Sequence, residues 1–300
     1  MRIGIIGAGR VGASFVFALP GQVVGITGST AKKTKAQADQ YGVTPYIHGE
    51  ELLLACDVVL LLVRDDALQP VSQSLADKLA HRKDVVFSTH TVLHGSGAAD
   101  VSVLQPLAAL GIHTGSLHPL QSFPAPSATA LQHIYMAVDG DDTAVSQAKE
   151  IASMLHSHSF YVPADERALY HGAACFCSNY VVTAVAAAQA LMSRWTDTPE
   201  DAGKALLPLF MGTAGNIQSQ SFVRNALTGP IARGDIGTVQ KHLACMPQPF
   251  HDAYTAFGIL TAQMALSNQT ITTNQYQQLI HILAVAEGEK HEQKSNNPDD

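Results

Sequence analysis

The chain begins with a short apolar segment, residues 3–6, followed directly by Gly7-Ala8-Gly9-Arg10-Val11-Gly12 and a second apolar segment, residues 13–19. This order predicts a strand, a tight turn and a helix. In turns with this glycine spacing the first glycine permits the turn, the second lets the backbone approach a pyrophosphate, and the third lets helix and strand pack closely. The N–H groups at the start of the helix would face the phosphates. We therefore expect a dinucleotide to bind around all six residues of this turn.

Length and composition suit a protein of two ordinary domains. The 300 residues are 46% apolar and only 14% charged, which suggests that much surface is buried, in part between subunits. The formal net charge is −7 and no run of Lys or Arg stands out, so nucleic acid is not an expected partner. The longest apolar stretch that we identify, residues 180–192, is too short to span a membrane, and we expect no membrane association.

The cysteines and the N-terminus indicate a cytoplasmic protein. The four cysteines form no Cys-x-x-Cys pair, and free thiols suit a reducing compartment. The N-terminal residues do not fit a secretory signal, because Arg10 and the motif glycines interrupt the apolar core that a signal needs. No group of histidines has zinc-like spacing, so no metal site is expected.

In the first half of the chain, strand-like and helix-like segments alternate, which indicates an α/β fold with a doubly wound parallel sheet of the Rossmann type. Residues 1–163 should form this dinucleotide-binding domain. The predicted strands are residues 3–6, 22–27, 57–63, 84–88, 113–117, 134–138 and 160–162. The predicted helices are residues 12–18, 31–41, 69–80, 102–110 and 143–155.

After Pro163 the strand signal disappears, and we expect an all-α domain over residues 164–287. A long Ala-rich helical stretch covers residues 165–195. Further helices are predicted at residues 199–214, 217–227, 236–245, 249–264 and 273–286. The polar tail, residues 288–300, is expected to be disordered.

The segment after the second strand indicates which dinucleotide binds. NAD sites usually carry an acidic residue there for the ribose 2′-hydroxyl. This chain has Gly28-Ser29-Thr30-Ala31-Lys32-Lys33, without an acid. Hydroxyls followed by lysines suit a 2′-phosphate, so the sequence favours NADP over NAD, with Ser29, Thr30 and Lys33 as contacts. In the alternative interpretation, Ser29 and Thr30 cap the next helix and the lysines are solvated.

A polar segment with a histidine, Gly115-Ser116-Leu117-His118-Pro119-Leu120-Gln121-Ser122-Phe123, follows a predicted strand. It therefore lies at the carboxyl end of the sheet, where ligands bind in open α/β folds. An imidazole can give or take the proton that accompanies hydride transfer. His118 is accordingly a catalytic candidate, with an ordinary loop histidine as the alternative.

Polar residues also recur along the first long helix of the second half. Arg167, Tyr170, His171 and Asn179 fall along one side at helical spacing within an otherwise Ala-rich stretch. They could project together into a cleft. A stripe at a subunit interface is the alternative.

The loop Leu227-Thr228-Gly229-Pro230-Ile231-Ala232-Arg233-Gly234-Asp235 is the last candidate. Arg233 could hold a substrate carboxylate or phosphate. It could equally pair with Asp235 and shape the turn.

The segments 115–123, 170–179 and 227–235, in this order behind an N-terminal dinucleotide fold, resemble one bacterial family. It couples a Rossmann-like domain to a helical C-terminal domain catalogued as of unknown function. The family is similar to the 6-phosphogluconate dehydrogenase-like group, which includes pyrroline-5-carboxylate reductase, ketopantoate reductase, hydroxyisobutyrate dehydrogenase and prephenate dehydrogenase. The resemblance implies a nicotinamide-dependent oxidoreductase whose helical domain forms a homodimer and closes the site. His118-Pro119 also resembles the His-Pro motif of prephenate dehydrogenases, whose histidine contacts the substrate hydroxyl.

The chain departs from these relatives in two places. Several of them carry a catalytic lysine early in the first long helix of the second domain, where this chain has Arg167. Arginine holds its proton too firmly to act as a general acid. The proline that follows the third strand in the relatives is replaced by Arg64, after Val63, and we place both residues near the nicotinamide.

Together these patterns predict an NADP-preferring oxidoreductase that acts on a small carbonyl, imine or alcohol between its two domains. We expect four residues to act on protons or orient the substrate: His118, His171, Asn179 and Ser116. Three more should contact the substrate: Arg167, Tyr170 and Arg233. Two rival interpretations stay open, a non-catalytic dinucleotide sensor and an enzyme that uses reduced deazaflavin.

Overall fold

The computed structural model describes residues 1–295, with side chains through residue 284. The chain divides into two compact units, Met1–Tyr180 and Val181–Asp300. Each unit is described by itself below.

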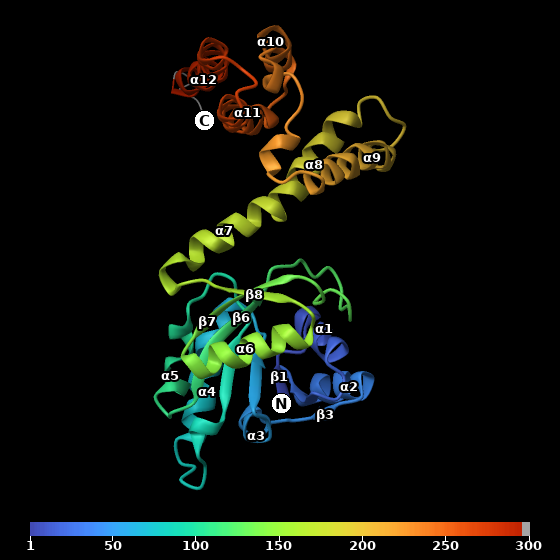
Figure 1. The fold of residues 1–300 in the computed structure, drawn as a ribbon. Helices are drawn as coiled ribbons and strands as arrows, with labels where there is room; N and C mark the ends of the chain where they lie inside the picture. The colour runs from blue at the N-terminus through green and yellow to red at the C-terminus, as the bar shows by residue number, and fades with distance from the viewer. Residues whose placement is uncertain (296–300) are drawn as a thin grey trace. The chain divides into compact units, whose positions relative to one another are not determined.

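The first unit is built on one eight-stranded sheet with the order β3-β2-β1-β4-β5-β6-β7-β8 (Figure 1). Its strands are β1 (Ile3–Ile6), β2 (Val23–Thr27), β3 (Thr44–Pro45), β4 (Val58–Leu61), β5 (Thr91–His94), β6 (His113–Pro119), β7 (Tyr135–Gly140) and β8 (His158–Tyr161). In the series β3-β2-β1-β4-β5-β6 each strand runs parallel to the next, which confirms the Rossmann-like arrangement.

The last two strands differ from the all-parallel sheet that the sequence predicts. β7 runs antiparallel to β6, and β8 runs parallel to β7. Parallel neighbours need a crossover, usually a helix, whereas residues 120–134 between β6 and β7 form no helix. The chain therefore turns back on itself after Pro119, and this segment lies beside the end of β6.

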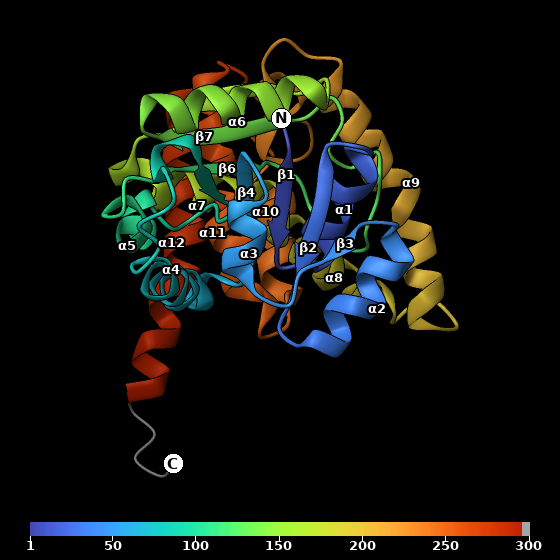
Figure 2. The same ribbon diagram turned by 90° about the horizontal axis from the view of Figure 1, so that it is seen from below.

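Helices cover both faces of the sheet. One face carries α1 (Arg10–Ala18), α2 (Ala31–Tyr41) and α6 (Asp142–Met154), and the other carries α3 (Gly49–Leu54), α4 (Asp65–Leu79) and α5 (Gln105–Ala108). Figure 2 shows α6 and α4 on opposite sides of the strands. The two faces follow from side-chain alternation: Val58 and Leu60 join the first cluster, and Val59 and Leu61 join the second.

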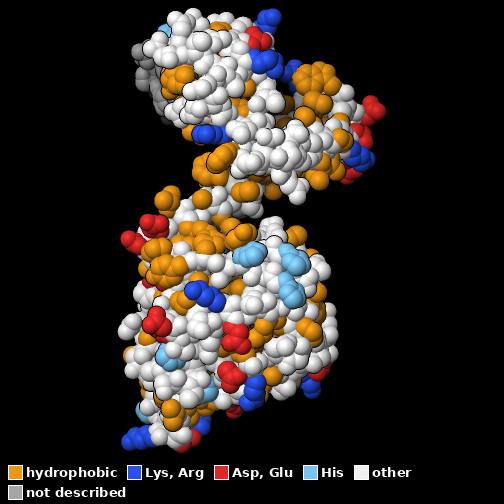
Figure 3. Space-filling model, viewed as in Figure 1, with side chains coloured by type: hydrophobic (Ala, Val, Ile, Leu, Met, Phe, Trp, Pro, Cys, Tyr) orange, Lys and Arg blue, Asp and Glu red, His pale blue; other side chains and the backbone are white. Residues whose placement is uncertain are grey.

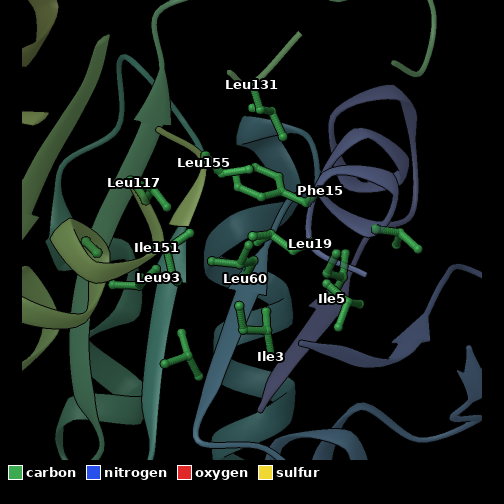
Figure 4. Close-up of a cluster of buried hydrophobic side chains, with 14 of the residues drawn as sticks. Ile3, Ile5, Phe15, Leu19, Leu60, Leu93, Leu117, Leu131, Ile151 and Leu155 are labelled. Atoms are coloured by element: carbon green, nitrogen blue, oxygen red, sulfur yellow. The ribbon is translucent and has the colours of Figure 1, made fainter. Parts of the chain in front are cut away.

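Figure 4 shows the first of these clusters. Side chains from the α1 side and the α6 side meet over strand residues such as Leu60. They are Phe15 and Leu19 from the α1 side and Ile151 and Leu155 from the α6 side. Burial of a large apolar side chain stabilises a fold by about 1.5–3 kcal/mol. These contacts fix α1, and with it the glycine turn, against the sheet.

The predicted strand at residues 84–88 is wrong. Asp84 lies in an exposed turn where both its carboxylate oxygens accept hydrogen bonds from Arg82, and residues Phe87–Thr89 form a short 3₁₀ helix. Val86 is 67% exposed, so it cannot belong to a buried strand. The strand is β5, which starts later and is buried along its whole length.

The helical part consists of α7 (Arg167–Cys177), α8 (Asn179–Met192), α9 (Pro199–Gln218), α10 (Ile236–Cys245), α11 (Phe250–Ser267) and α12 (Thr273–Ser295). The core of the second unit joins α10, α11 and α12 through Val239, Ala262 and Leu279. The predicted helix at residues 217–227 is wrong. α9 ends at Gln218, where the Ser219 hydroxyl donates to the Asn216 carbonyl, and only a 3₁₀ turn, Val223–Ala226, follows.

Two predicted boundaries lie elsewhere in the structure. The first unit extends to Tyr180 rather than to residue 163, because α7 is held against the sheet by contacts described below. α12 continues through Ser295, across part of the tail that we expected to be disordered. Residues 296–300 of that tail lie outside the described residues.

The apolar surface of α7 and α8 was underestimated from the sequence. Within the described residues, one helical stretch, Ala164–Met192, is long and apolar enough to cross a membrane, and its most apolar window is not buried. Only Ser178 separates the two helices, so the stretch is longer than residues 180–192 alone. Exposed side chains include Leu169 and Phe176 of α7, the helix along which Figure 3 shows hydrophobic surface. Length and composition alone are weak grounds for a membrane span.

Candidate functional site

The glycine turn between β1 and α1 has the geometry of a phosphate cradle. Gly7 has φ +100°, and a Cβ there would stand 2.5 Å from the Leu62 carbonyl oxygen. A Cβ on Gly12 would collide with the Gly7 carbonyl. A Cβ on Gly9, in contrast, would meet no atom within 4 Å, so the space above this residue is open.

The start of α1 is also free to receive an anion. Gly9 is the N-cap, no side chain caps the helix, and its first turn holds no acidic residue. Unpaired N–H groups and the helix dipole favour negative charge at such an end. The residues present therefore fit a dinucleotide pyrophosphate, with Arg10 and Val11 following in the exposed and half-buried part of the turn.

The three predicted NADP contacts lie after β2, at the start of α2. Ser29 and Lys33 are exposed and available to a phosphate. The Thr30 hydroxyl accepts a hydrogen bond of 3.3 Å from the Lys33 backbone and caps α2, as the alternative interpretation proposed. Gln37 of α2 donates to the Ala8 carbonyl at 2.7 Å, which ties this helix to the glycine turn.

Val63 and Arg64 follow β4 at the same edge of the sheet. Val63 packs against the core, and its side chain lies beside the position where a Gly7 Cβ would stand. The Arg64 side chain is 85% exposed and pairs with Asp66 at 2.7 Å. Arg64 is thus free to swing towards a ligand at little cost, since exposed ion pairs are weak.

A row of buried polar side chains crosses three neighbouring strands. His94 of β5 lies opposite Ser116 of β6, which lies opposite Asp139 of β7. All three are almost fully buried. Buried polar groups need partners. Ser116 accepts from the Arg167 side chain, whereas His94 and Asp139 each accept from a backbone N–H, of Ser96 and Gly140 respectively.

Arg167, the first residue of α7, is fully buried over this row. Its Nη1 donates to Ser116 Oγ at 2.9 Å and its Nη2 donates to the Ser96 carbonyl at 2.7 Å. Burial lowers the pKa of Arg167, and the nearby carboxylates of Asp139 and Asp100 oppose that shift. Arg167 and Ser116 therefore anchor α7 to the sheet and are absent from the cavity lining given below.

The anchored helix brings Tyr170 and His171 to His118. His118 Nδ1 lies 2.7 Å from the Tyr170 hydroxyl, and the His118 ring centroid is 5.6 Å from the Tyr170 ring and 6.0 Å from the His171 ring. A Cβ on Gly97 would stand 2.6 Å from His171 Nδ1 and 2.8 Å from His118 Nε2. Gly97 thus allows the two imidazoles to converge on one spot of the β5 loop.

These groups form one wall of a cavity of about 590 Å³ within the first unit. His118, Tyr170, His171 and Asn179 line it, so the structure brings these four predicted residues together. The other lining residues are mostly apolar or small and include Leu120, Gln121, Ser122, Phe160, Ala173, Ala174, Cys175, Cys177 and Ser178.

Burial and the arginine set the protonation of this cluster. Burial, then Arg167, then His171 lower the pKa of His118 to about 4. Burial raises the pKa of Tyr170 to about 12, and Arg167 opposes that shift. Near neutral pH the imidazole of His118 is therefore uncharged and the phenol keeps its proton.

Sequence reasoning missed the loop that follows β5. His94, Ser96 and Gly97 belong to His94-Gly95-Ser96-Gly97, a glycine-rich segment directly after a strand. Burial is the main cause that lowers the pKa of His94 to about 3. The misplaced strand at residues 84–88 hid this loop, although small residues after a buried strand are a usable signal for a site.

Arg233 belongs to the second unit. It ends a short 3₁₀ helix, Ile231–Arg233, beside the left-handed Gly234. Asp235 caps α10 by accepting from the Thr238 backbone and hydroxyl, and these bonds, more than Arg233, lower the pKa of the Asp235 carboxyl.

One hydroxyl links α1 to the segment between β6 and β7. The fully buried Ser14 donates to the Arg10 carbonyl at 2.8 Å and accepts from the Ser127 backbone at 3.0 Å. The same segment carries Leu120 and Gln121 of the cavity wall.

Fold and glycine turn define the class of this protein: a Rossmann-like α/β domain is followed by a helical domain. Family models match both parts, a Rossmann-like domain at residues 1–119 and the domain of unknown function DUF2520 at residues 134–261. The chain therefore combines a Rossmann-like domain with a DUF2520 domain, which confirms the resemblance seen in the sequence. No curated protein sequence matches the chain significantly.

Solved structures share this fold. A Bacteroides fragilis protein described as an NADP oxidoreductase has a TM-score of 0.67 at 20% identity, over 87% of this chain and 98% of that one. Pyrroline-5-carboxylate reductase from Streptococcus pyogenes has a TM-score of 0.57 at 15% identity, over 94% and 98%. The Aspergillus terreus reductive aminase, in complex with NADPH and ethyl-5-oxohexanoate, has a TM-score of 0.56 at 15% identity, over 96% and 94%. At these identities the likeness concerns the fold.

Proposed function

We propose that this protein is an NADP-dependent oxidoreductase that transfers hydride between the nicotinamide and a small carbonyl, imine or alcohol. The observation that carries the proposal is the placement of two features at one edge of one sheet. The open glycine turn follows β1, and the His118–Tyr170–His171 cluster stands at the end of β6. The strands from β1 to β6 in the sheet are parallel, so their carboxyl ends lie at the same edge.

The residues divide the work between cofactor and substrate. Gly7, Gly9 and Gly12 with the start of α1 would hold the pyrophosphate, and Val63 and Arg64 would stand near the nicotinamide. When bound, the nicotinamide supplies or accepts the hydride. His118, Tyr170 and His171 orient the substrate oxygen or nitrogen and handle its proton, and Asn179 adds an amide to the same wall.

NADP rather than NAD is supported by the end of β2. Ser29 and Lys33 are exposed there, and no acidic residue replaces them. The Bacteroides fragilis protein and the reductive aminase of the same fold are described with NADP and NADPH. A cationic lysine beside a 2′-phosphate discriminates between the two cofactors by charge.

Absorbance of reduced NADP tests the proposal. The protein is incubated with NADPH and a panel of small oxo acids, ketones and cyclic imines, and binding of NADPH is followed in parallel by calorimetry. Turnover of one panel member supports the oxidoreductase. Tight NADPH binding without turnover supports the non-catalytic sensor, and tighter binding of reduced deazaflavin than of NADPH supports the third interpretation.

We also propose a cytoplasmic homodimer. Leu169, Phe176 and Val182 are more than half exposed along α7 and α8, and exposed apolar surface of this extent usually meets a partner. Four free cysteines suit a reducing compartment. Light scattering on the purified protein should give twice the chain mass, whereas a monomer that sediments with vesicles would contradict the proposal.

A further inference from the structure

The hydrogen bond between His118 and Tyr170 satisfies both groups only if the Tyr170 hydroxyl donates and His118 Nδ1 accepts. The two atoms, Nδ1 and the phenol oxygen, are 2.7 Å apart. Tyr170 is protonated, since burial raises its pKa to about 12, and its proton needs an acceptor. Among the residues that the structure describes, Nδ1 of His118 is the acceptor bonded to this hydroxyl.

If Nδ1 accepts, the proton of the neutral imidazole is on Nε2. Nε2 makes no hydrogen bond with the described residues, and His118 lines the cavity. Nε2 stands beside Gly97, 2.8 Å from the position that a Cβ would take there, at the wall that His118 lines. We place the substrate against this N–H donor. A donor binds an atom with a free lone pair, such as a carbonyl or alcohol oxygen. The nitrogen of a protonated imine carries hydrogen and has no lone pair to offer.

We propose that Tyr170 locks His118 as the Nε2–H tautomer, and that the cavity consequently selects a ketone or aldehyde, or the corresponding alcohol, over a protonated imine. This inference rests on the proposed function for its reaction and narrows the substrate class. Tyr170 acts through His118 and is thus a positioning residue.

The proton balance of the reduction follows from this lock. A bound reduced nicotinamide would supply the hydride for the carbonyl carbon, and the C=O electron pair would then belong to the oxygen. The oxygen takes the Nε2 proton, Nδ1 takes the phenol proton, and the imidazole ends neutral with its proton moved to the other nitrogen. The phenolate that is left regains a proton from water.

Arg167 makes this relay feasible. Its charge lowers the pKa of Tyr170 and thus stabilises the phenolate. The same charge disfavours an imidazolium at His118, so a proton moves through the ring without being stored there. Arg167 keeps its own proton throughout.

The lock is tested first by nitrogen NMR, which needs neither cofactor nor turnover. Long-range ¹⁵N–¹H spectra of histidine-labelled protein should show His118 as the Nε2–H tautomer, with its signals assigned from His118→Gln. Tyr170→Phe should turn it into a mixture of tautomers. Tyr254→Phe is the matched control, because Tyr254 bonds His242 Nδ1 at 2.8 Å with the same edge-on ring geometry. It should alter His242 and leave His118 unchanged.

Selectivity is tested on the same signals. Cyclohexanone should shift the His118 resonances of the NADP⁺-loaded protein at a concentration about tenfold lower, or more, than the matched ring imine 2,3,4,5-tetrahydropyridine in its protonated form. Tyr170→Phe should remove this preference. A wild-type Nδ1–H tautomer, an unchanged His118 in Tyr170→Phe, equal or stronger binding of the imine, or no His118 shift with the ketone would each overturn the proposal. Selective ketone shifts without NADPH turnover would refute the reductase and leave the lock standing.

Discussion

Arg167 Nη1 donates to Ser116 Oγ at 2.9 Å, so the first residue of α7 is fixed to the middle of β6. Two residues further along β6 stands His118, and one turn further along α7 stand Tyr170 and His171. The bond between Arg167 and Ser116 therefore sets the distance between His118 on β6 and the two residues on α7.

Loss of this anchor should destabilise the first unit. Arg167→Met leaves the Ser96 carbonyl, Ser116 and Asp139 without their cationic partner, and we expect a loss of about 2–4 kcal/mol in the free energy of unfolding. Denaturant titration measures it. Arg82→Ala, which breaks an exposed pair with Asp84, is the control and should cost at most about 0.5 kcal/mol. Equal effects of the two variants would mean that Arg167 is not an anchor.

The glycine turn allows binding to be separated from folding. Gly9 has φ −72° and open space above it, so Gly9→Ala should fold normally and weaken NADP binding by about tenfold or more, because the methyl group occupies the phosphate site. Gly12→Ala should instead destabilise the fold by about 2 kcal/mol, since its methyl group collides with Gly7. Calorimetry and thermal unfolding distinguish the two. Unchanged NADP affinity in Gly9→Ala would argue against the cradle.

Lys33 should discriminate between the cofactors. Lys33→Ala removes a charge beside the expected 2′-phosphate, and NADP affinity should fall about tenfold while NAD affinity stays the same. Titration with both cofactors checks this. Lys83→Ala, in a turn after α4, serves as the control for overall charge. Parallel losses for NADP and NAD would contradict the assignment.

His118 should matter for turnover more than for cofactor affinity. His118→Ala is expected to lower kcat for the substrate identified by the panel by about 100-fold or more, because the proton donor is lost. NADPH affinity should be close to that of the wild type. Steady-state kinetics and calorimetry on one preparation test both statements, and unchanged kcat would remove His118 from the mechanism.

Stability should fall as the solution becomes mildly acidic. Folding lowers the pKa of His118 from 6.5 to about 4 and that of His94 to about 3. Between these values the unfolded chain binds more protons than the folded one, so acid favours unfolding, while above about pH 6.5 the contribution is fully retained. We expect a loss of about 1–3 kcal/mol between about pH 7 and pH 4.5. Denaturant midpoints measure it, and His118→Gln should show a smaller decrease than the wild type.

The sequence predicted well those features that depend on local pattern. Ile3–Ile6, Ala31–Tyr41 and Ile236–Cys245 lie where periodicity and capping placed them, and the glycine turn has the predicted geometry. Tyr170 and His171 share one wall because helical spacing is a local property, and Asn179, the first residue of α8, lines the same cavity across the break at Ser178. Such features need no knowledge of distant contacts.

What the sequence could not predict depends on residues far apart in the chain. Arg167 was expected to hold substrate, but its partners Ser96 and Ser116 lie on other strands and bury it. The direction of β7 depends on a connection without a crossover helix. The apolar residues 85–87 are typical of a strand, and only the structure shows that Val86 is exposed. The His118–Tyr170 bond joins residues 52 positions apart.

The hydroxyl of Ser14 has a consequence for the order of ligand binding. It joins the helix that would carry the nucleotide charge to the chain segment that includes part of the cavity wall, so the two cannot shift independently without breaking a hydrogen bond of the buried Ser14 hydroxyl. A nucleotide that steadies α1 also steadies that segment. The substrate compartment of this protein is thus expected to take its final shape only after the nucleotide has bound.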